Sequence, residues 1–278
     1  MRSRNAFLNE MKNKLTETID IMEEEFKLVA DFDMKLIFDF FSGMKRQGPG
    51  GDEETKMALS FINGLSKDSK IVDIGCGTGT QTLVLAQNTE SKIIASDISP
   101  EMIEGVQAKI DQYHLEERVE TQIASMDNLP FKEKELDLIW AESSIFIIGF
   151  KRGLTEWRKY LKDNGMIAIS EASWFTNERP SEIEDFWMAN YPEIDTISAN
   201  IKIMQDAGYT PMAHFILPER CWIENFYIHM ARRIEEYELL YENNDKVKDF
   251  LERQKEEIDI YNKYKEYFGY VFYIGKKR

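Results

Sequence analysis

Cysteine and histidine are rare in this sequence, which contains two cysteines and three histidines. Cys76 and Cys221 lie far apart, so neither a disulfide framework nor a zinc-type spacing is present. No apolar run is long enough to span a bilayer, and the basic start at Met1 is not followed by the apolar stretch of a signal peptide. These absences exclude a disulfide-rich secreted protein. They predict a cytoplasmic protein with no membrane partner and no metal site.

Basic residues are also in short supply, with 35 lysines and arginines against 50 acidic residues and a net charge of −15. Proteins that bind nucleic acids draw much of their affinity from basic side chains that neutralise phosphates. A nucleic-acid partner is therefore disfavoured. Hydrophobic residues make up 43% of the chain, which is enough to form a substantial core.

The first fifty residues are predicted to form a helical segment and a loop. Apolar residues recur every three or four positions between Ala6 and Phe41, which is typical of an amphipathic helix. This stripe fits packing against the rest of the chain, against a second subunit in a homodimer, or over a binding site as a lid. A glycine-rich loop at 46–51 ends the helix, and we expect the main domain to cover 51–278.

Strands and helices alternate from Lys70 onward, which predicts a doubly wound α/β fold with a mostly parallel sheet. Helical additions are expected at about 172–264. The final strand is expected to enter the sheet antiparallel, at its edge. The seven predicted strands are Lys70–Gly75, Ser91–Asp97, Val119–Ile123, Leu136–Ala141, Met166–Glu171, Thr210–Leu217 and Tyr267–Gly275.

The segment after the first predicted strand carries the chemistry. Asp73 is followed by Gly75, Gly77 and Gly79, so the chain turns sharply from a strand into a helix. Glycine tolerates positive φ and lets the backbone approach a ligand closely. Ligands of open α/β sheets bind at this place, beyond the carboxyl ends of the strands.

The spacing and the acidic residue distinguish between two cofactors. Dinucleotide-binding proteins have the pattern G-x-G-x-x-G and place a pyrophosphate at the turn. Here the pattern is G-x-G-x-G, and the Asp73 carboxylate would repel a pyrophosphate. It would attract the cationic amino-acid end of S-adenosylmethionine (SAM). Asp97, about 20 positions after the turn, is the residue expected to accept hydrogen bonds from two ribose hydroxyls.

Taken in order, these motifs resemble the class I SAM-dependent methyltransferases over about Gly50–Glu171. The branch that acts on small molecules in quinone and polyketide biosynthesis is the most similar. The resemblance implies a Rossmann-like methyltransferase fold, SAM as cofactor, S-adenosylhomocysteine as product and a small-molecule acceptor. The cofactor-binding residues that it implies are Gln47, Gly48, Asp73, Gly75, Cys76, Gly77, Gly79, Asp97, Ile98, Met102, Met126, Asp127, Ala141 and Glu142.

Residues for catalysis are harder to choose, because methyl transfer mainly requires alignment of the reacting atoms. A general base is needed only when the acceptor must lose a proton. His214 and Glu142 are the candidates for that role. Glu142 and Glu171, which end the fourth and fifth predicted strands, are also candidates to orient the acceptor or hold an amine.

Three other functions remain open at this stage. A NAD-dependent oxidoreductase would need the other glycine spacing. A non-catalytic SAM-binding protein would bind the cofactor and turn over no acceptor. A methyltransferase acting on protein or RNA would need an open, basic groove, and the chain lacks the Asn-Pro-Pro-Tyr motif of many such enzymes.

Overall fold

Two short helices precede the sheet. In the computed structural model, which describes residues 34–278, these are α2 (Met34–Ser42) and α3 (Asp52–Leu59). The Phe40 ring of α2 is fully buried, in edge-to-face contact with Tyr237 and Phe250. This aromatic cluster fixes α2 beside the loop that leads to α3. The part of the predicted N-terminal helix before Met34 lies outside the described residues.

The alternating elements of the first half agree closely with the sequence prediction. Ser99 caps α5, since its hydroxyl accepts a hydrogen bond from the Met102 N–H, and proline follows at the first helical position. The elements are β1 (Lys70–Ile74), α4 (Thr80–Asn88), β2 (Lys92–Asp97), α5 (Pro100–Tyr113), β3 (Val119–Ile123) and β4 (Leu136–Ala141).

The second half is more helical. The additions lie mainly between β5 and the last strand, and a single π-type turn, η4, joins α9 to α10. The elements are η2 (Ile145–Ile147), α6 (Phe150–Trp157), η3 (Arg158–Tyr160), β5 (Leu161–Trp174), α7 (Ser181–Asn190), β6 (Asp195–Thr196), α8 (Ile197–Asp206), β7 (Tyr209–Ile216), α9 (Glu219–Trp222), η4 (Ile223–Tyr227), α10 (Ile228–Leu240), α11 (Asp245–Tyr264) and β8 (Phe268–Lys277).

The strands form one sheet in the order β3-β2-β1-β4-β5-β8-β7, with the two-residue β6 paired to β5. The strands from β3 to β5 run parallel, and β8 is antiparallel to both β5 and β7. The predicted mostly parallel, doubly wound sheet is thereby confirmed. Its order reverses between β1 and β4, which is the point where ligands bind in this architecture.

Apolar side chains fill both faces of the sheet, as the buried strands require. One core contains residues of α3, α4, α5 and the α9–α11 hairpin. The other contains residues of α6 and α8. Helices therefore cover the two faces, which leaves the carboxyl ends of the parallel strands as the place for a site.

The position of the last strand differs from the sequence prediction. β8 is antiparallel as expected, but it lies between β5 and β7 and is not at the edge. Its residues Phe268–Ile274 are all buried, so its sequence is apolar on both faces. A strand of that composition is stable only with a neighbour on each side, and β7 supplies the second neighbour. The half-exposed β7 forms the edge.

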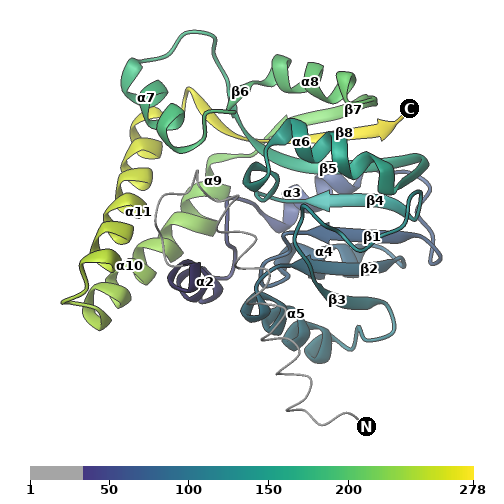
Figure 1. Cartoon of the computed structure of the whole chain (residues 1–278), viewed down its shortest axis with the longest axis horizontal. Coiled ribbons are helices and arrows are strands. Elements are labelled where there is room, and N and C mark those ends of the chain that lie inside the picture. Colours follow the sequence, from purple (N-terminus) through teal and green to yellow (C-terminus); the bar gives the residue numbers. More distant parts are fainter. Residues whose placement is uncertain (1–33) are drawn as a thin grey trace.

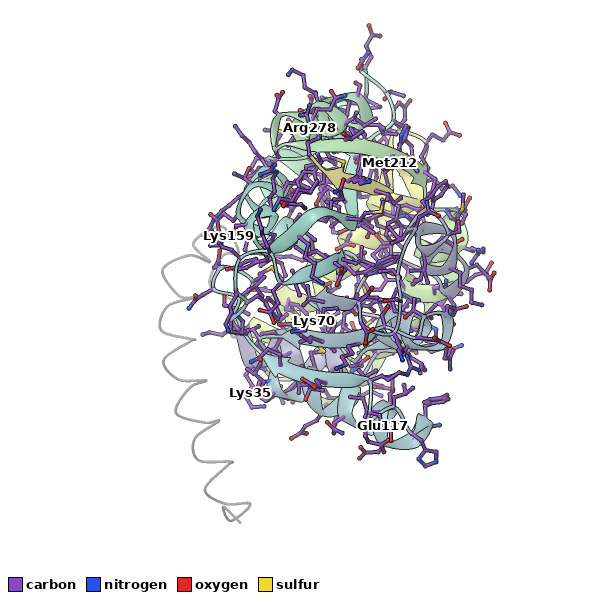
Figure 2. All side chains as sticks on the ribbon, turned by 90° about the vertical axis from the view of Figure 1, so that its right-hand side faces the viewer. Lys35, Lys70, Glu117, Lys159, Met212 and Arg278 are labelled. Atoms are coloured by element: carbon purple, nitrogen blue, oxygen red, sulfur yellow. The ribbon has the colours of Figure 1, made fainter. Side chains whose placement is uncertain are left out.

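Different segments of the chain lie at the carboxyl and amino ends of the parallel strands. Helices α2, α9, α10 and α11 lie beyond the carboxyl ends of the parallel strands (Figure 1). Figure 2 views the opposite end, where Lys70 begins β1, Lys159 precedes β5 and Arg278 follows β8.

In residues 34–278, no helix is long and apolar enough to cross a membrane. The same residues contain no group of three side chains suited to hold a metal ion.

Candidate cofactor and acceptor site

The glycine turn that follows β1 has the backbone conformation that the sequence predicts. Gly75, Gly77 and Gly79 have φ values of 66°, 54° and 82°, a region that other residues rarely occupy. A Cβ atom at Gly75 would lie 2.5 Å from the Ser144 Cβ, and one at Gly77 would lie 2.1 Å from the Gln47 Oε1. Both positions therefore require glycine for conformation and for space.

Asp97 is held at the end of β2 beside this turn. Its Oδ2 accepts a hydrogen bond of 2.9 Å from the Gly77 N–H, and its Oδ1 accepts one of 3.0 Å from the Ser99 N–H. Burial raises the pKa of this carboxyl, and the backbone donors oppose that rise. Because each carboxylate oxygen has a further lone pair, Asp97 can still accept hydrogen bonds from two ribose hydroxyls.

Asp73 lies behind the turn. Its side chain is fully buried, and its oxygens accept hydrogen bonds from the Thr82 hydroxyl at 2.6 Å and the Gln81 amide at 3.4 Å. Burial raises its pKa to about 7, partly offset by these donors. Gln81 also donates to the Cys76 carbonyl, so Asp73 supports the turn from within. Any influence of its charge on a ligand acts at a distance or through Gln81.

Cys76 occupies the middle of the turn and is fully buried. Its backbone N–H donates to the Ser96 carbonyl at 3.0 Å, as does the N–H of Gly75 at 2.8 Å. Burial raises the pKa of the thiol well above its usual range. The side chain therefore serves as a small packed group, and its thiol remains protonated.

The segment Arg46–Gly51, here called the strap, crosses directly over the turn. The Gln47 side-chain oxygen accepts a hydrogen bond from the Thr78 N–H at 3.0 Å, and its amide donates to the carbonyls of Phe41 and Met44. A Cβ atom at Gly48 would lie 2.6 Å from the Ser143 Cβ. The structure thus brings the predicted residues Gln47 and Gly48 into contact with the glycine turn and with the end of β4.

Glu142 anchors the strap. Its carboxylate accepts hydrogen bonds from the Thr55 hydroxyl at 2.7 Å, the Trp140 indole N–H at 3.0 Å and Arg46 at 3.2 Å. Burial raises its pKa, while Arg46 and the other donors oppose the rise. Arg46 also forms an ion pair with Asp52 at 2.8 Å. With these partners engaged, the geometry supports a positioning role for Glu142 better than the predicted role as a base.

The residues predicted to contact the adenosine part lie around the same edge. Ile98 follows Asp97, and Met102 is buried at the start of α5. The Met126 methyl would lie 3.2 Å from a Cβ at Gly75. Asp127 forms an ion pair with Arg152 at 2.7 Å, and Ala141 is buried at the end of β4. These five residues lie at or after the carboxyl ends of three strands, β2, β3 and β4.

His214 does not join this group. It is exposed on β7, and its neighbour in the register is Tyr273 of β8. Strands β4, β5 and β8 lie between β7 and the glycine turn of β1. The structure therefore offers no support for His214 as the catalytic base.

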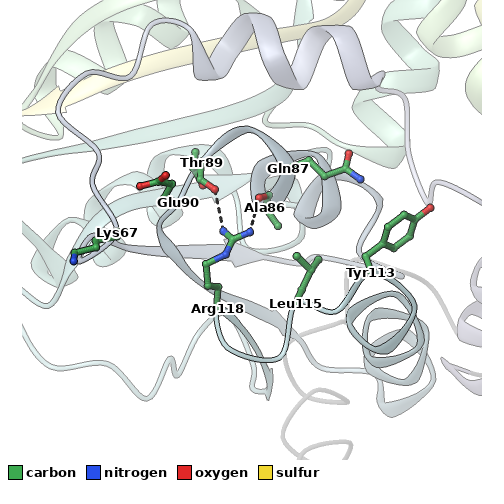
Figure 3. A pocket seen from close by; sticks show the side chains of 8 residues that line it. All are labelled: Lys67, Ala86, Gln87, Thr89, Glu90, Tyr113, Leu115 and Arg118. Carbon is green, nitrogen blue, oxygen red and sulfur yellow. Dashed lines mark hydrogen bonds between the residues drawn. The ribbon is translucent and has the colours of Figure 1, made fainter.

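Two hollows of very different size bear on the location of the site. The strap covers a cavity of about 40 Å³, lined by Arg46, Gln47, Gly48, Pro49, Gly75, Cys76, Gln81, Glu142 and Ser143. A wider hollow of about 610 Å³ lies between the Lys67 loop, the end of α4 and the residues before β3 (Figure 3). There Arg118 donates to the carbonyls of Ala86 and Thr89.

The small cavity is the better candidate because it lies at the carboxyl ends of β1 and β4. The wider hollow is at the amino ends, where neither the glycine turn nor Asp97 is present. Small-molecule sites usually enclose several hundred Å³. The cavity under the strap is therefore large enough for only part of a cofactor.

Sequence reasoning missed several residues that build this site. Arg46, Thr55, Ser143 and Ser144 belong to no recognised motif, yet each contacts the strap or the turn. Ser143 has a positive φ of 52°, and its hydroxyl donates to the Pro49 carbonyl at 2.8 Å. Ser144 donates to the Ile74 carbonyl at 2.8 Å. Only the position of these serines after β4 hinted at a role.

Comparisons with known proteins agree with the site geometry. Residues 71–165 match a sequence-family model described as a methyltransferase domain. The chain is 30% identical over 113 residues to the ubiquinone/menaquinone biosynthesis C-methyltransferase UbiE of Geobacter sp. strain M21, covering 40% of this chain and 48% of that protein. It is 25% identical over 162 residues to phosphoethanolamine N-methyltransferase 1 of Arabidopsis thaliana, covering 58% of this chain and 32% of that protein. The chain spans less than half the length of each of these two relatives.

The fold is likewise shared with solved structures. A SAM-dependent methyltransferase from Geobacter sulfurreducens, in complex with S-adenosyl-L-homocysteine, superposes with a TM-score of 0.77 at 14% identity, over 89% of this chain and 99% of that one. The family match covers the glycine turn, Asp97 and Glu142, which are the residues that build the site. Over residues 71–165 the chain thus matches a methyltransferase domain, and its fold is the one found in solved SAM-dependent methyltransferases.

Proposed function

We propose that this protein transfers the methyl group of SAM to a small-molecule acceptor and releases S-adenosylhomocysteine. The observation that supports this most strongly is the pairing of Asp97 with the glycine turn. Both Asp97 oxygens are oriented by backbone N–H groups, one of them from Gly77 itself. This arrangement gives a ribose acceptor and a close backbone approach at the same sheet edge.

The chain's own residues divide the work between binding and alignment. Asp97 would hold the ribose, and Ile98, Met102, Met126 and Asp127 would surround the adenine. Gln47 and Gly48 of the strap would close over the methionine end. SAM, when bound, supplies an electrophilic methyl group. The strap and the loop after β4 would exclude water and hold the acceptor in line, and such alignment can lower a barrier by about 7–11 kcal/mol at best.

The acceptor would bind among the additions at about 172–264, which rise above the carboxyl edge. Among the relatives, one is named for carbon methylation and another for nitrogen methylation. We infer a small molecule because the chain is strongly acidic and the site is enclosed by the strap. A protein or RNA acceptor is the alternative, and the acidic charge of the chain disfavours RNA. A cytoplasmic location and a homodimer stay predictions.

Calorimetric titration with SAM and, separately, with NAD tests the proposal. We expect SAM to bind and NAD not to bind. Asp97→Ala should weaken SAM binding at least about tenfold, because hydrogen bonds to a charged group contribute about 1.5–3 kcal/mol each. Asp97→Asn, which keeps the shape, should also weaken it. Asp111→Ala, an exposed change on α5, is the matched control and should bind SAM normally.

Two results would contradict this assignment. If folded wild-type protein, free of copurified ligand, failed to bind SAM, then SAM would not be its cofactor. Unchanged SAM affinity in Asp97→Ala would show that Asp97 does not bind the ribose. SAM binding with no methyl transfer to any acceptor in a labelled-donor screen would favour the non-catalytic alternative.

A further inference from the structure

Glu171 is a buried acid that the site described so far does not use. It lies near the end of β5, and its side chain is only 1% exposed. Neither of its carboxyl oxygens makes a hydrogen bond with any group of residues 34–278. Burial raises the pKa of this carboxyl well above its usual range. Buried polar groups nearly always have a partner, so this exception calls for a functional explanation.

The groups around Glu171 add no compensating positive charge. The Tyr191 hydroxyl and the Ala172 backbone N–H approach it and oppose the rise in its pKa, but neither reaches hydrogen-bond geometry. Glu193, in the connection before β6, raises that pKa further. From β8, Tyr270 and Tyr273 are within electrostatic range. In the described part of the chain, no lysine, arginine or histidine is among the groups that set the pKa of Glu171.

The other buried acids of this edge are different. Asp73 is bonded to Thr82, and Glu142 is bonded to Arg46, Thr55 and Trp140. The Tyr191 hydroxyl, by contrast, is a second buried group without a hydrogen-bond partner. Glu171 and Tyr191 thus form a pair of adjacent polar groups that remain unsatisfied by the protein.

This pair lies close to the glycine turn. Ser144 is packed against Gly75, because a Cβ atom added at Gly75 would lie 2.5 Å from the Ser144 Cβ. Two residues later, the Phe146 ring contacts the Tyr191 ring, with 6.0 Å between centroids. Residues two apart in sequence are separated by at most about 7 Å. The loop after β4 therefore connects the glycine turn to Tyr191, which lies beside Glu171.

We propose that Glu171, assisted by Tyr191, binds a protonated amine group of the methyl acceptor. This proposal rests on the proposed function and names the chemical class of its substrate. A cation favours the ionised carboxylate and forms a charge-assisted hydrogen bond with it, whereas a neutral polar group provides neither in full. Phe146 and Ile147 are 38% and 43% exposed at the same place, which suits an acceptor with an apolar body.

The test compares benzylamine with benzyl alcohol, which share an apolar ring and differ in charge. Both are titrated calorimetrically into the full chain saturated with S-adenosylhomocysteine at pH 7. We expect the amine to bind at least tenfold more tightly than the alcohol.

Glu171→Gln should abolish the preference for the amine, while S-adenosylhomocysteine affinity stays within twofold. Glu120→Gln, an exposed change on β3, is the matched control and should behave as wild type. Tyr191→Phe keeps the acid and removes only the hydroxyl. It should weaken amine binding several-fold, and it provides the test should Glu171→Gln fail to fold.

The possible outcomes distinguish a failure of the role of Glu171 from a failure of the proposed function. Wild-type protein that does not bind S-adenosylhomocysteine would sink the proposed function. Cofactor binding with equal affinity for amine and alcohol would overturn only the role of Glu171. The same role is overturned by a Glu171→Gln protein that keeps the tenfold preference, or by a Tyr191→Phe protein with unchanged amine affinity.

Discussion

Asp73, Glu142 and Glu171 are three buried carboxyls near one edge of the sheet, and their surroundings assign them different work. Asp73, in β1, is bonded to neutral donors of the next helix, Thr82 and Gln81 of α4. Glu142 is bonded to a cation of the strap. Glu171 has no bonded partner among the described residues. All three side chains end in a carboxyl group, so the partners of each group decide its role.

The pH dependence of stability should reveal the state of Asp73. Its pKa of about 7 in the folded protein exceeds the ordinary value of 3.8. The stability linked to this group is therefore complete below about pH 4 and is lost as the pH rises through about 7. Relative to wild type, Asp73→Asn should gain stability over that range, on the order of a few kcal/mol.

Urea unfolding of both proteins between pH 4.5 and 8 measures this effect as a difference in the free energy of unfolding. The exposed Asp111→Asn serves as the control and should show a pH-independent difference from wild type. A difference between Asp73→Asn and wild type that does not change with pH would show that Asp73 is already ionised in the folded protein.

At the scale of elements, a buried ion pair is one of the contacts that hold the strap. Arg46 and Glu142 have side chains that are 6% and 4% exposed, and they join the strap to the end of β4. Breaking such a pair by removing one partner typically costs about 3–5 kcal/mol. Because Arg46 keeps Asp52 as a partner, the cost here should lie at or below the lower limit.

Glu142→Gln should therefore loosen the strap. We expect faster hydrogen–deuterium exchange at 46–51 and weaker SAM binding, while exchange in β1 and β2 stays slow. Glu135→Gln breaks a more exposed pair, with Lys70, and should change stability by no more than about 1 kcal/mol. Unchanged exchange in the strap of Glu142→Gln would mean that Gln47 and the glycine contacts hold it alone.

For the whole molecule, completion of the sheet depends on the end of the chain. β8 pairs with β5 along nine residue pairs, from Met166↔Lys276 to Trp174↔Phe268, and it also pairs with β7. Its apolar side chains contribute to both cores. Without β8, the edge of β5 would be open and β7 would lose its only neighbour within the sheet of the described residues.

Deletion of residues 268–278 should thus abolish cooperative unfolding and cause aggregation, since long unpaired strand edges promote association. Thermal unfolding followed by circular dichroism, together with light scattering, provides the measurement. Deletion of Arg278 alone is the control and should leave a cooperative transition. A cooperative transition near the wild-type Tm in the longer deletion would show that the first five strands fold independently of β8.

The sequence by itself determined the alternation of strands and helices, the glycine turn and the ribose acid Asp97. Each of these depends on local rules, namely hydrophobic periodicity, glycine's access to positive φ and the fixed distance between successive strands. The tertiary structure alone decided that β8 lies inside the sheet, that the strap is anchored by Glu142, and that His214 is remote from the site. It also left Glu171 without a hydrogen-bond partner. Those features depend on which distant segments meet, and local patterns carry no information about such pairings.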